Sequence, residues 1–105
     1  MNAESVGADA QGGASFATDR SWNVSGALTV DSAASVLAAS ETAALPETGI
    51  VSMSGLRAVD SAGVAVMLSW RRRAMAEGRT LAFTDVPPAL RALAELYSVE
   101  DLLTQ

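Results

Sequence analysis

The sequence predicts a single α/β domain with a mixed sheet of four to five strands and helices packed on one side of it. Half of the 105 residues are hydrophobic, which is enough for one packed core. Two segments near the N-terminus alternate apolar and polar residues, as half-buried strands do. After them, strand-forming segments alternate with helical ones, and this order is typical of α/β folds.

Residues 1–13 are small and polar and end in two glycines, so we expect a flexible tail in front of a domain that spans residues 14–105. Residues 15–18 and 21–25 carry the alternating pattern. We expect them to form a β-hairpin whose turn contains Asp19 and Arg20, and we expect Trp22 of its second strand to be a core residue.

A helix and a central strand are predicted next. Gly26 is expected to end the second strand, and residues 29–32 offer N-capping side chains to an alanine-rich helix that reaches about Leu45. A proline and a glycine then break the pattern. Residues 50–53 are a short run of strand formers, and we expect them to form a buried central strand.

The second helix is predicted over residues 62–77, with Gly78 as its C-terminal cap. At about 100° per residue, one stripe of this helix should face the sheet. That stripe contains Val64, Met67, Leu68 and Met75, and Arg71 shares it.

The last elements are a strand over residues 80–84, a helix that starts at Pro87 and Pro88 and reaches Tyr97, and a short turn or helix over residues 99–103. The predicted order is therefore two strands followed by helix, strand, helix, strand and helix.

Composition argues against catalysis and against several ligand classes. The chain has no cysteine or histidine, and all 7 basic residues are arginine. Most nucleophile–base pairs and soft-metal sites therefore cannot be built, and we expect no catalytic residue, metal or cofactor. A formal charge of −5 argues against nucleic-acid binding. No apolar run approaches a membrane span, and no secretion signal is present, so we expect a cytoplasmic protein.

The segment from the central strand to the second helix points to a function. It places Asp60 and Ser61 at the start of the helix, where backbone N–H groups lack intrahelical partners and favour a hydroxyl or a phosphate. Because Gly63 has no side chain, it would leave room for a partner protein to approach the first turn of the helix.

The chain here resembles the STAS domain family. The resemblance rests on the run V-D-S-A-G-V of residues 59–64 after a strand, and on L-R-A-L-A-E-L-Y of residues 90–97, and it covers residues 14–103. Within the family, the ending at residues 93–97 is most similar to the MlaB type, the small cytoplasmic subunit of a phospholipid-transporting ABC transporter. Many family members carry an acidic or amide residue where this chain has Ser52.

The resemblance implies an accessory role. The first expectation is a subunit that binds the transporter's ATPase subunit through Asp60, Ser61, Ala62 and Gly63 and meets the membrane only indirectly, at the inner face of the inner membrane. The alternative is an anti-sigma factor antagonist that binds a serine kinase and is released when Ser61, the candidate phosphoacceptor, is phosphorylated. A nucleotide-binding domain is a third option, against which the lack of a glycine-rich phosphate loop argues. Ser61 could also serve only as a helix cap.

A second docking face is predicted on a flank of the same helix. Val66, Trp70 and Arg73 follow an i, i+4, i+7 spacing away from the predicted core stripe, and exposed tryptophan beside arginine is common in interfaces. The other interpretation is that Trp70 packs under the first or third helix. The arginine run 71–73, with Arg79, is either a solvated helix end or a contact to acidic partners or lipid head groups.

Overall fold

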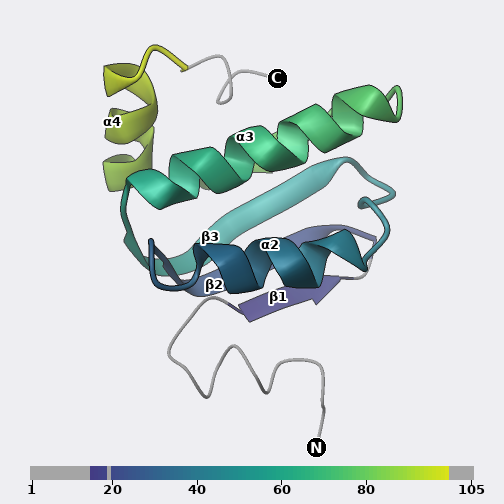
Figure 1. Cartoon of the computed structure of the whole chain (residues 1–105), viewed down its shortest axis with the longest axis horizontal. Helices are drawn as coiled ribbons and strands as arrows, with labels where there is room; N and C mark the ends of the chain where they lie inside the picture. Colours follow the sequence, from purple (N-terminus) through teal and green to yellow (C-terminus); the bar gives the residue numbers. More distant parts are fainter. Residues whose placement is uncertain (1–14, 19, 100–105) are drawn as a thin grey trace, which may run out of the picture.

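The computed structural model describes residues 15–18 and 20–99, which form an α/β domain (Figure 1). Its elements are β1 (Ser15–Thr18), β2 (Trp22–Leu28), α2 (Ala33–Glu41), β3 (Ile50–Val59), α3 (Ser61–Ala76), β4 (Ala82–Thr84) and α4 (Pro88–Leu96). The predicted order of strands and helices is therefore confirmed. The predicted tail over 1–13, residue 19 of the hairpin turn and residues 100–103 of the last turn lie outside the described residues.

The strands form one sheet in the order β1-β2-β3-β4. β1 pairs antiparallel with β2, as the predicted hairpin requires, while β2, β3 and β4 run parallel. The sheet is thus mixed, as expected. The described residues contribute four strands to it, so the upper figure of five was too high.

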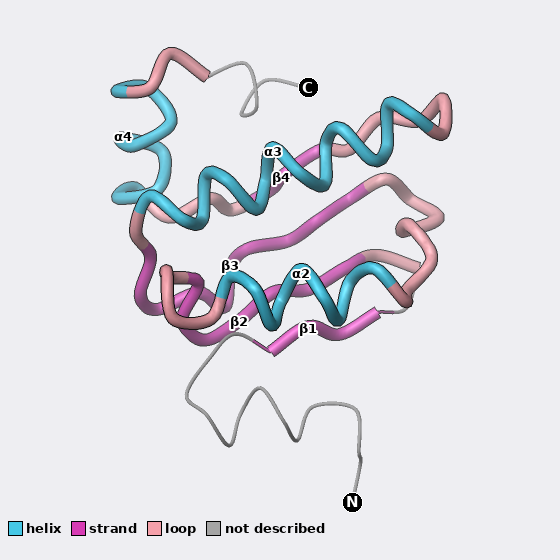
Figure 2. Tube along the Cα trace, in the orientation of Figure 1, coloured by secondary structure: helices cyan, strands magenta, loops and turns pink. Residues whose placement is uncertain are grey.

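The core lies on one face of the sheet. Trp22 pairs with Val51 and Val51 with Phe83, and all three side chains are buried. The neighbouring row is polar and at least partly exposed, and it consists of Asn23, Ser52 and Thr84. Because side chains alternate between the two faces of a strand, this pattern separates a covered face from an open one. In Figure 2, α2 and α3 both pass in front of the strands, which agrees with helices on one side.

Two tryptophans decide how α3 packs. The rings of Trp22 and Trp70 meet edge to face, with centroids 5.4 Å apart and planes at 72°. The Trp70 indole N–H also donates a hydrogen bond to Ser40 Oγ in α2, at 2.8 Å. The core placement of Trp22 is confirmed, and Trp70 packs under the first helix, as the second interpretation of that residue expected. A buried aromatic pair with a satisfied polar atom is a strong anchor for helix orientation.

The buried face of α3 consequently differs from the predicted stripe. The buried residues of the helix are Gly63, Val64, Val66, Met67, Trp70 and Ala74. Val64 and Met67 confirm the prediction, and Leu68 is partly buried. Met75 is 61% exposed, so its assignment to the core was wrong. Because the large Trp70 ring is buried, the buried side of α3 is rotated about the helix axis relative to the predicted stripe, and Met75 lies outside it.

Two strands are longer than the sequence predicts. β2 continues through Gly26 to Leu28, and β3 continues to Val59 instead of ending at a turn. The additional residues of β2 pair with the additional residues of β3. Gly26 has a φ of 91° beside a register shift, a backbone shape that glycine adopts without steric cost. The predicted turn after residue 53 is therefore strand, because interstrand hydrogen bonds extend the sheet there.

The first helix is shorter than predicted and ends at Glu41, short of Leu45. Arg73 of α3 provides the reason. Its guanidinium donates hydrogen bonds to the backbone oxygens of Ser40, at 2.8 Å, and Ala43, at 2.7 Å. Because these donors from another helix satisfy carbonyls at the helix end, the chain can leave the helix early and turn toward β3.

The remaining boundaries lie close to the predictions. β4 is shorter than residues 80–84, and α4 begins at Pro88, as the proline pair predicted. None of the helices in the described part of the chain combines the length and the apolarity that crossing a bilayer requires.

Replacing the tryptophan of α3 should unfold the domain more easily. We expect Trp70→Ala to lower the free energy of unfolding by about 3–5 kcal/mol, because it leaves a large cavity beside Trp22 and removes the hydrogen bond to Ser40. Urea denaturation followed by circular dichroism measures this. The control is Arg72→Ala on the exposed side of α3, which should change stability by less than about 0.5 kcal/mol. Equal unfolding midpoints for the two variants would contradict the buried position of Trp70.

Candidate protein-docking site

A single residue, Asp60, lies between the central strand and the longest helix. β3 ends at Val59 and α3 begins at Ser61. Asp60 has an extended backbone, and its Oδ1 accepts a hydrogen bond from the Ala62 N–H at 2.8 Å, which is the geometry of an N-cap. The capping side chain is thus Asp60, and the interpretation of Ser61 as the cap was wrong.

The second carboxylate oxygen of Asp60 fastens a neighbouring turn. Oδ2 accepts a hydrogen bond from the Val30 N–H at 3.0 Å. The backbone N–H of Asp60 donates to the carbonyl of Leu28 at 3.3 Å. The turn between β2 and α2 is therefore held against the start of α3 by one residue.

Ser61 is the first residue of α3 and is exposed. The hydrogen bonds of the described residues do not use its hydroxyl. The side chain lies at the N-terminus of the helix, where the helix dipole is positive. The prediction of a serine at the helix start is confirmed, and the residue is exposed. Ala62 beside it is partly exposed.

Gly63 has a different role from the predicted one. The residue is buried, and a Cβ atom there would come within 3.1 Å of Leu90 Cδ1 and 3.5 Å of the Leu28 carbonyl oxygen. Glycine therefore allows α4 to pack closely against the first turn of α3. The expectation that Gly63 opens the surface for a partner was wrong, because the space beside it is filled by Leu90 of α4.

Of the three residues predicted to form a second docking face on a flank of α3, two are buried and Arg73 is only partly exposed. Val66 is 0% and Trp70 1% exposed, so neither can touch a partner while the domain stays folded. Arg73 uses its guanidinium on carbonyls at the end of α2 and on Glu77, 3.3 Å away. The prediction of this face was wrong, because Val66 and Trp70 belong to the core and Arg73 makes its hydrogen bonds within the domain.

The arginines at the end of α3 are divided between structure and solvent. Besides Arg73, Arg79 donates hydrogen bonds to the backbone oxygens of Pro46 and Glu47, in the connection between α2 and β3. Arg72 is exposed. The interpretation of this run as an entirely solvated helix end therefore does not hold, since two of its members brace a loop.

The structure adds one residue that the sequence analysis did not place at the site. Val30 is 73% exposed, and it lies in the turn held by Asp60. The signal available in the sequence is an apolar residue among the polar capping side chains of residues 29–32. That signal is weak, because single exposed apolar residues are common on protein surfaces.

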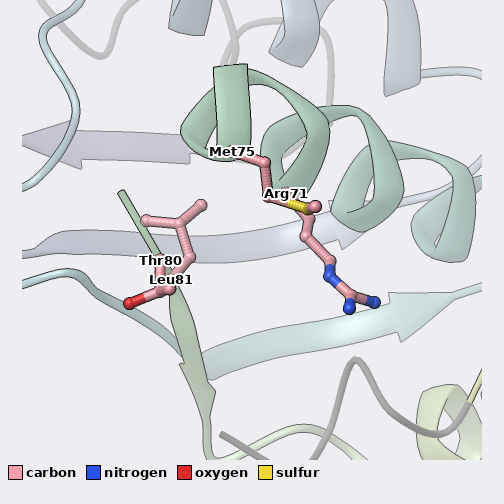
Figure 3. Close-up of a pocket in the computed structure, with 4 residues that line it drawn as sticks. All are labelled: Arg71, Met75, Thr80 and Leu81. Atoms are coloured by element: carbon pink, nitrogen blue, oxygen red, sulfur yellow. The ribbon is translucent and has the colours of Figure 1, made fainter. Parts of the chain in front are cut away.

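A hollow at the other end of α3 is separate from this site. It is lined by Arg71, Met75, Thr80 and Leu81 (Figure 3). Arg71 follows Ser61 by about 15 Å along the helix axis, at 1.5 Å per residue. The hollow therefore cannot share a small ligand with Ser61. Within the described ranges, no group of three or more acidic, histidine or cysteine side chains could hold a metal ion.

The fold identifies the class of protein to which the chain belongs. The structure is similar to the solved structure of the anti-sigma factor antagonist SpoIIAA in its unphosphorylated form, with a TM-score of 0.62 at 16% sequence identity, covering 87% of this chain and 85% of that one. The fold is that of a STAS domain.

A comparison of the sequence with family models identifies the family within this class. Residues 19–104 match the family model described as MlaB, STAS domain, and the chain belongs to that family. Among curated proteins, none matches the chain significantly.

Removing the Asp60 carboxylate should loosen the junction. We expect Asp60→Ala to lower the free energy of unfolding by about 1–2 kcal/mol, because two N–H groups lose their acceptor, and Asp60→Asn to lower it less, because one oxygen remains. Thermal and urea unfolding measure both. Asp31→Ala removes an exposed carboxylate from the adjoining turn and should change stability by less than about 0.5 kcal/mol. If Asp60→Ala behaved like Asp31→Ala, the two hydrogen bonds would not hold the junction.

Proposed function

We propose that the chain is a non-catalytic subunit that binds the ATPase subunit of a phospholipid-transporting ABC transporter, at the cytoplasmic side of the inner membrane. Membership of the MlaB STAS family supports this proposal. The observation that carries it is the exposed Ser61, presented on a braced helix start. Such a transporter maintains the lipid asymmetry of the outer membrane.

The junction around Asp60 suits docking because it is rigid before the partner arrives. The cap fixes the first turn of α3, and Gly63 lets α4 support that turn from behind. A surface that is already ordered loses little conformational freedom on binding, and more of the contact energy appears as affinity. The bound subunit would in turn stabilise the folded ATPase by mass action.

Several features of the sequence support a role without catalysis. The chain contains no histidine, cysteine or lysine, so the usual general bases and nucleophiles other than hydroxyls and carboxylates cannot be assembled. Ser61 accordingly acts in this proposal as a contact residue and attacks no substrate.

The alternative function is an anti-sigma factor antagonist that is regulated by phosphorylation of Ser61. The likeness of its fold to the anti-sigma factor antagonist SpoIIAA favours it, together with the accessible Ser61 hydroxyl. A phosphate would add about −1.5 to −2 charges next to the Asp60 carboxylate. That repulsion would change the surface that a partner meets.

Charge at Ser61 should weaken binding of the ATPase. We expect Ser61→Asp to lower the affinity for the purified ATPase subunit by about tenfold or more, because the larger aspartate side chain does not fit a contact made for a hydroxyl and repels the Asp60 carboxylate beside it. Ser61→Ala should change it by about threefold or less. Isothermal titration calorimetry measures both. Ser35→Asp, which adds the same charge on the exposed side of α2, is the control. Equal affinities for the Asp variants at 61 and 35 would sink the proposed site.

A kinase assay separates the two functions. Incubation with ATP and the serine kinase of an anti-sigma system, followed by mass spectrometry, should leave Ser61 unmodified if the chain serves a transporter. Stoichiometric phosphorylation at Ser61, together with no binding to the ABC ATPase, would favour the alternative.

A further inference from the structure

The turn between β2 and α2 exposes an apolar side chain to solvent. Val30 is 73% exposed, and Asp31 next to it is exposed as well. A lone exposed valine in a loose loop would need no explanation. This turn, however, is held in place by several hydrogen bonds.

The turn is braced from inside by Ser32, which is 5% exposed. The Ser32 hydroxyl donates to the carbonyl of Ala27 at 2.8 Å and accepts from the backbone N–H of Thr29 at 3.1 Å. The backbone N–H groups of Ser32 and Ala33 both donate to the carbonyl of Thr29, at 3.0 and 2.9 Å. These bonds fix the backbone on both sides of Val30.

Asp60 places this turn beside the docking site. The N–H groups of Val30 and Ala62 bind the two oxygens of the same carboxylate, at 3.0 and 2.8 Å. The tip of the turn and the first turn of α3 must therefore be neighbours, with Ser61 in the same stretch of surface. An apolar side chain, a hydroxyl and two carboxylates, those of Asp31 and Asp60, are thus gathered at one end of the domain.

We propose that Val30 is the apolar anchor of the docking site and enters an apolar pocket with a basic rim on the ABC-transporter ATPase subunit. The inference rests on the proposed function and adds the β2–α2 turn as the second half of the interface. Valine is stiff at χ1, and its backbone is already fixed, so little freedom is lost when the side chain is buried. The carboxylates of Asp31 and Asp60 flank the anchor, which is why the matching rim is basic.

Substitutions at Val30 test this assignment by calorimetric titration of the purified ATPase subunit. We expect Val30→Asp to weaken binding by at least about tenfold, because burial of the side chain is lost and a charge enters the pocket. Val30→Thr, which keeps the shape but adds a hydroxyl, should weaken binding by a smaller factor and serves as the test if Val30→Asp fails to fold. The control is Met75→Asp, at a residue that is 61% exposed toward the far end of α3, and it should bind like the unmodified chain.

The outcomes separate this inference from the proposed function. If Ser61→Asp weakens binding and neither Val30 variant does, the anchor is refuted while the docking site at Ser61 stands. If the unmodified chain does not bind the ATPase subunit at all, both proposals fall. Equal losses for Val30→Asp and Met75→Asp would also overturn the anchor, since they would reflect added charge alone.

Discussion

The carboxylate of Asp60 is the interaction on which the functional end of the domain depends. One oxygen caps α3 and the other holds the turn after β2, so a single side chain joins the central strand, the longest helix and the neighbouring loop. The backbone N–H of the same residue continues the contact between β2 and β3. Because no other residue lies between β3 and α3, the position of the strand in the sheet determines where Ser61 emerges.

The other end of α3 is organised by a different set of contacts. Trp22 and Trp70 pack edge to face in the core, and the guanidinium of Arg73 satisfies carbonyls at the end of α2. These contacts orient α3 about its axis and fix the connection that leads back to the sheet. Contacts within the domain thus hold both ends of α3. Both sets of contacts matter for the site, because a rotation of α3 about its axis would bury Ser61 or move it away from the turn at Val30.

The chain belongs to the MlaB STAS family, and the side chains around the start of α3 differ in what they contact. Two polar side chains near the site bind the backbone, since Asp60 caps α3 and Ser32 braces the turn after β2, whereas no hydrogen bond of the described residues uses the Ser61 hydroxyl. The apolar Val30 stands in the open on a fixed turn. This division between bracing and presented side chains is what the proposed docking role requires.

Local patterns in the sequence determined the order of the elements, the start of α3 at Asp60 and Ser61, and the family, because caps, breakers and motifs act over a few neighbouring residues. Only the tertiary structure decided which side of α3 is buried. Periodicity shows that Val66, Trp70 and Arg73 share a side, but whether that side meets water depends on Trp22 and Ser40, which are distant in sequence. The same holds for Gly63, whose space is filled by Leu90, and for Val30, whose turn is held by a carboxylate thirty positions away. Packing between remote segments is a property of the whole chain, and no local window contains it.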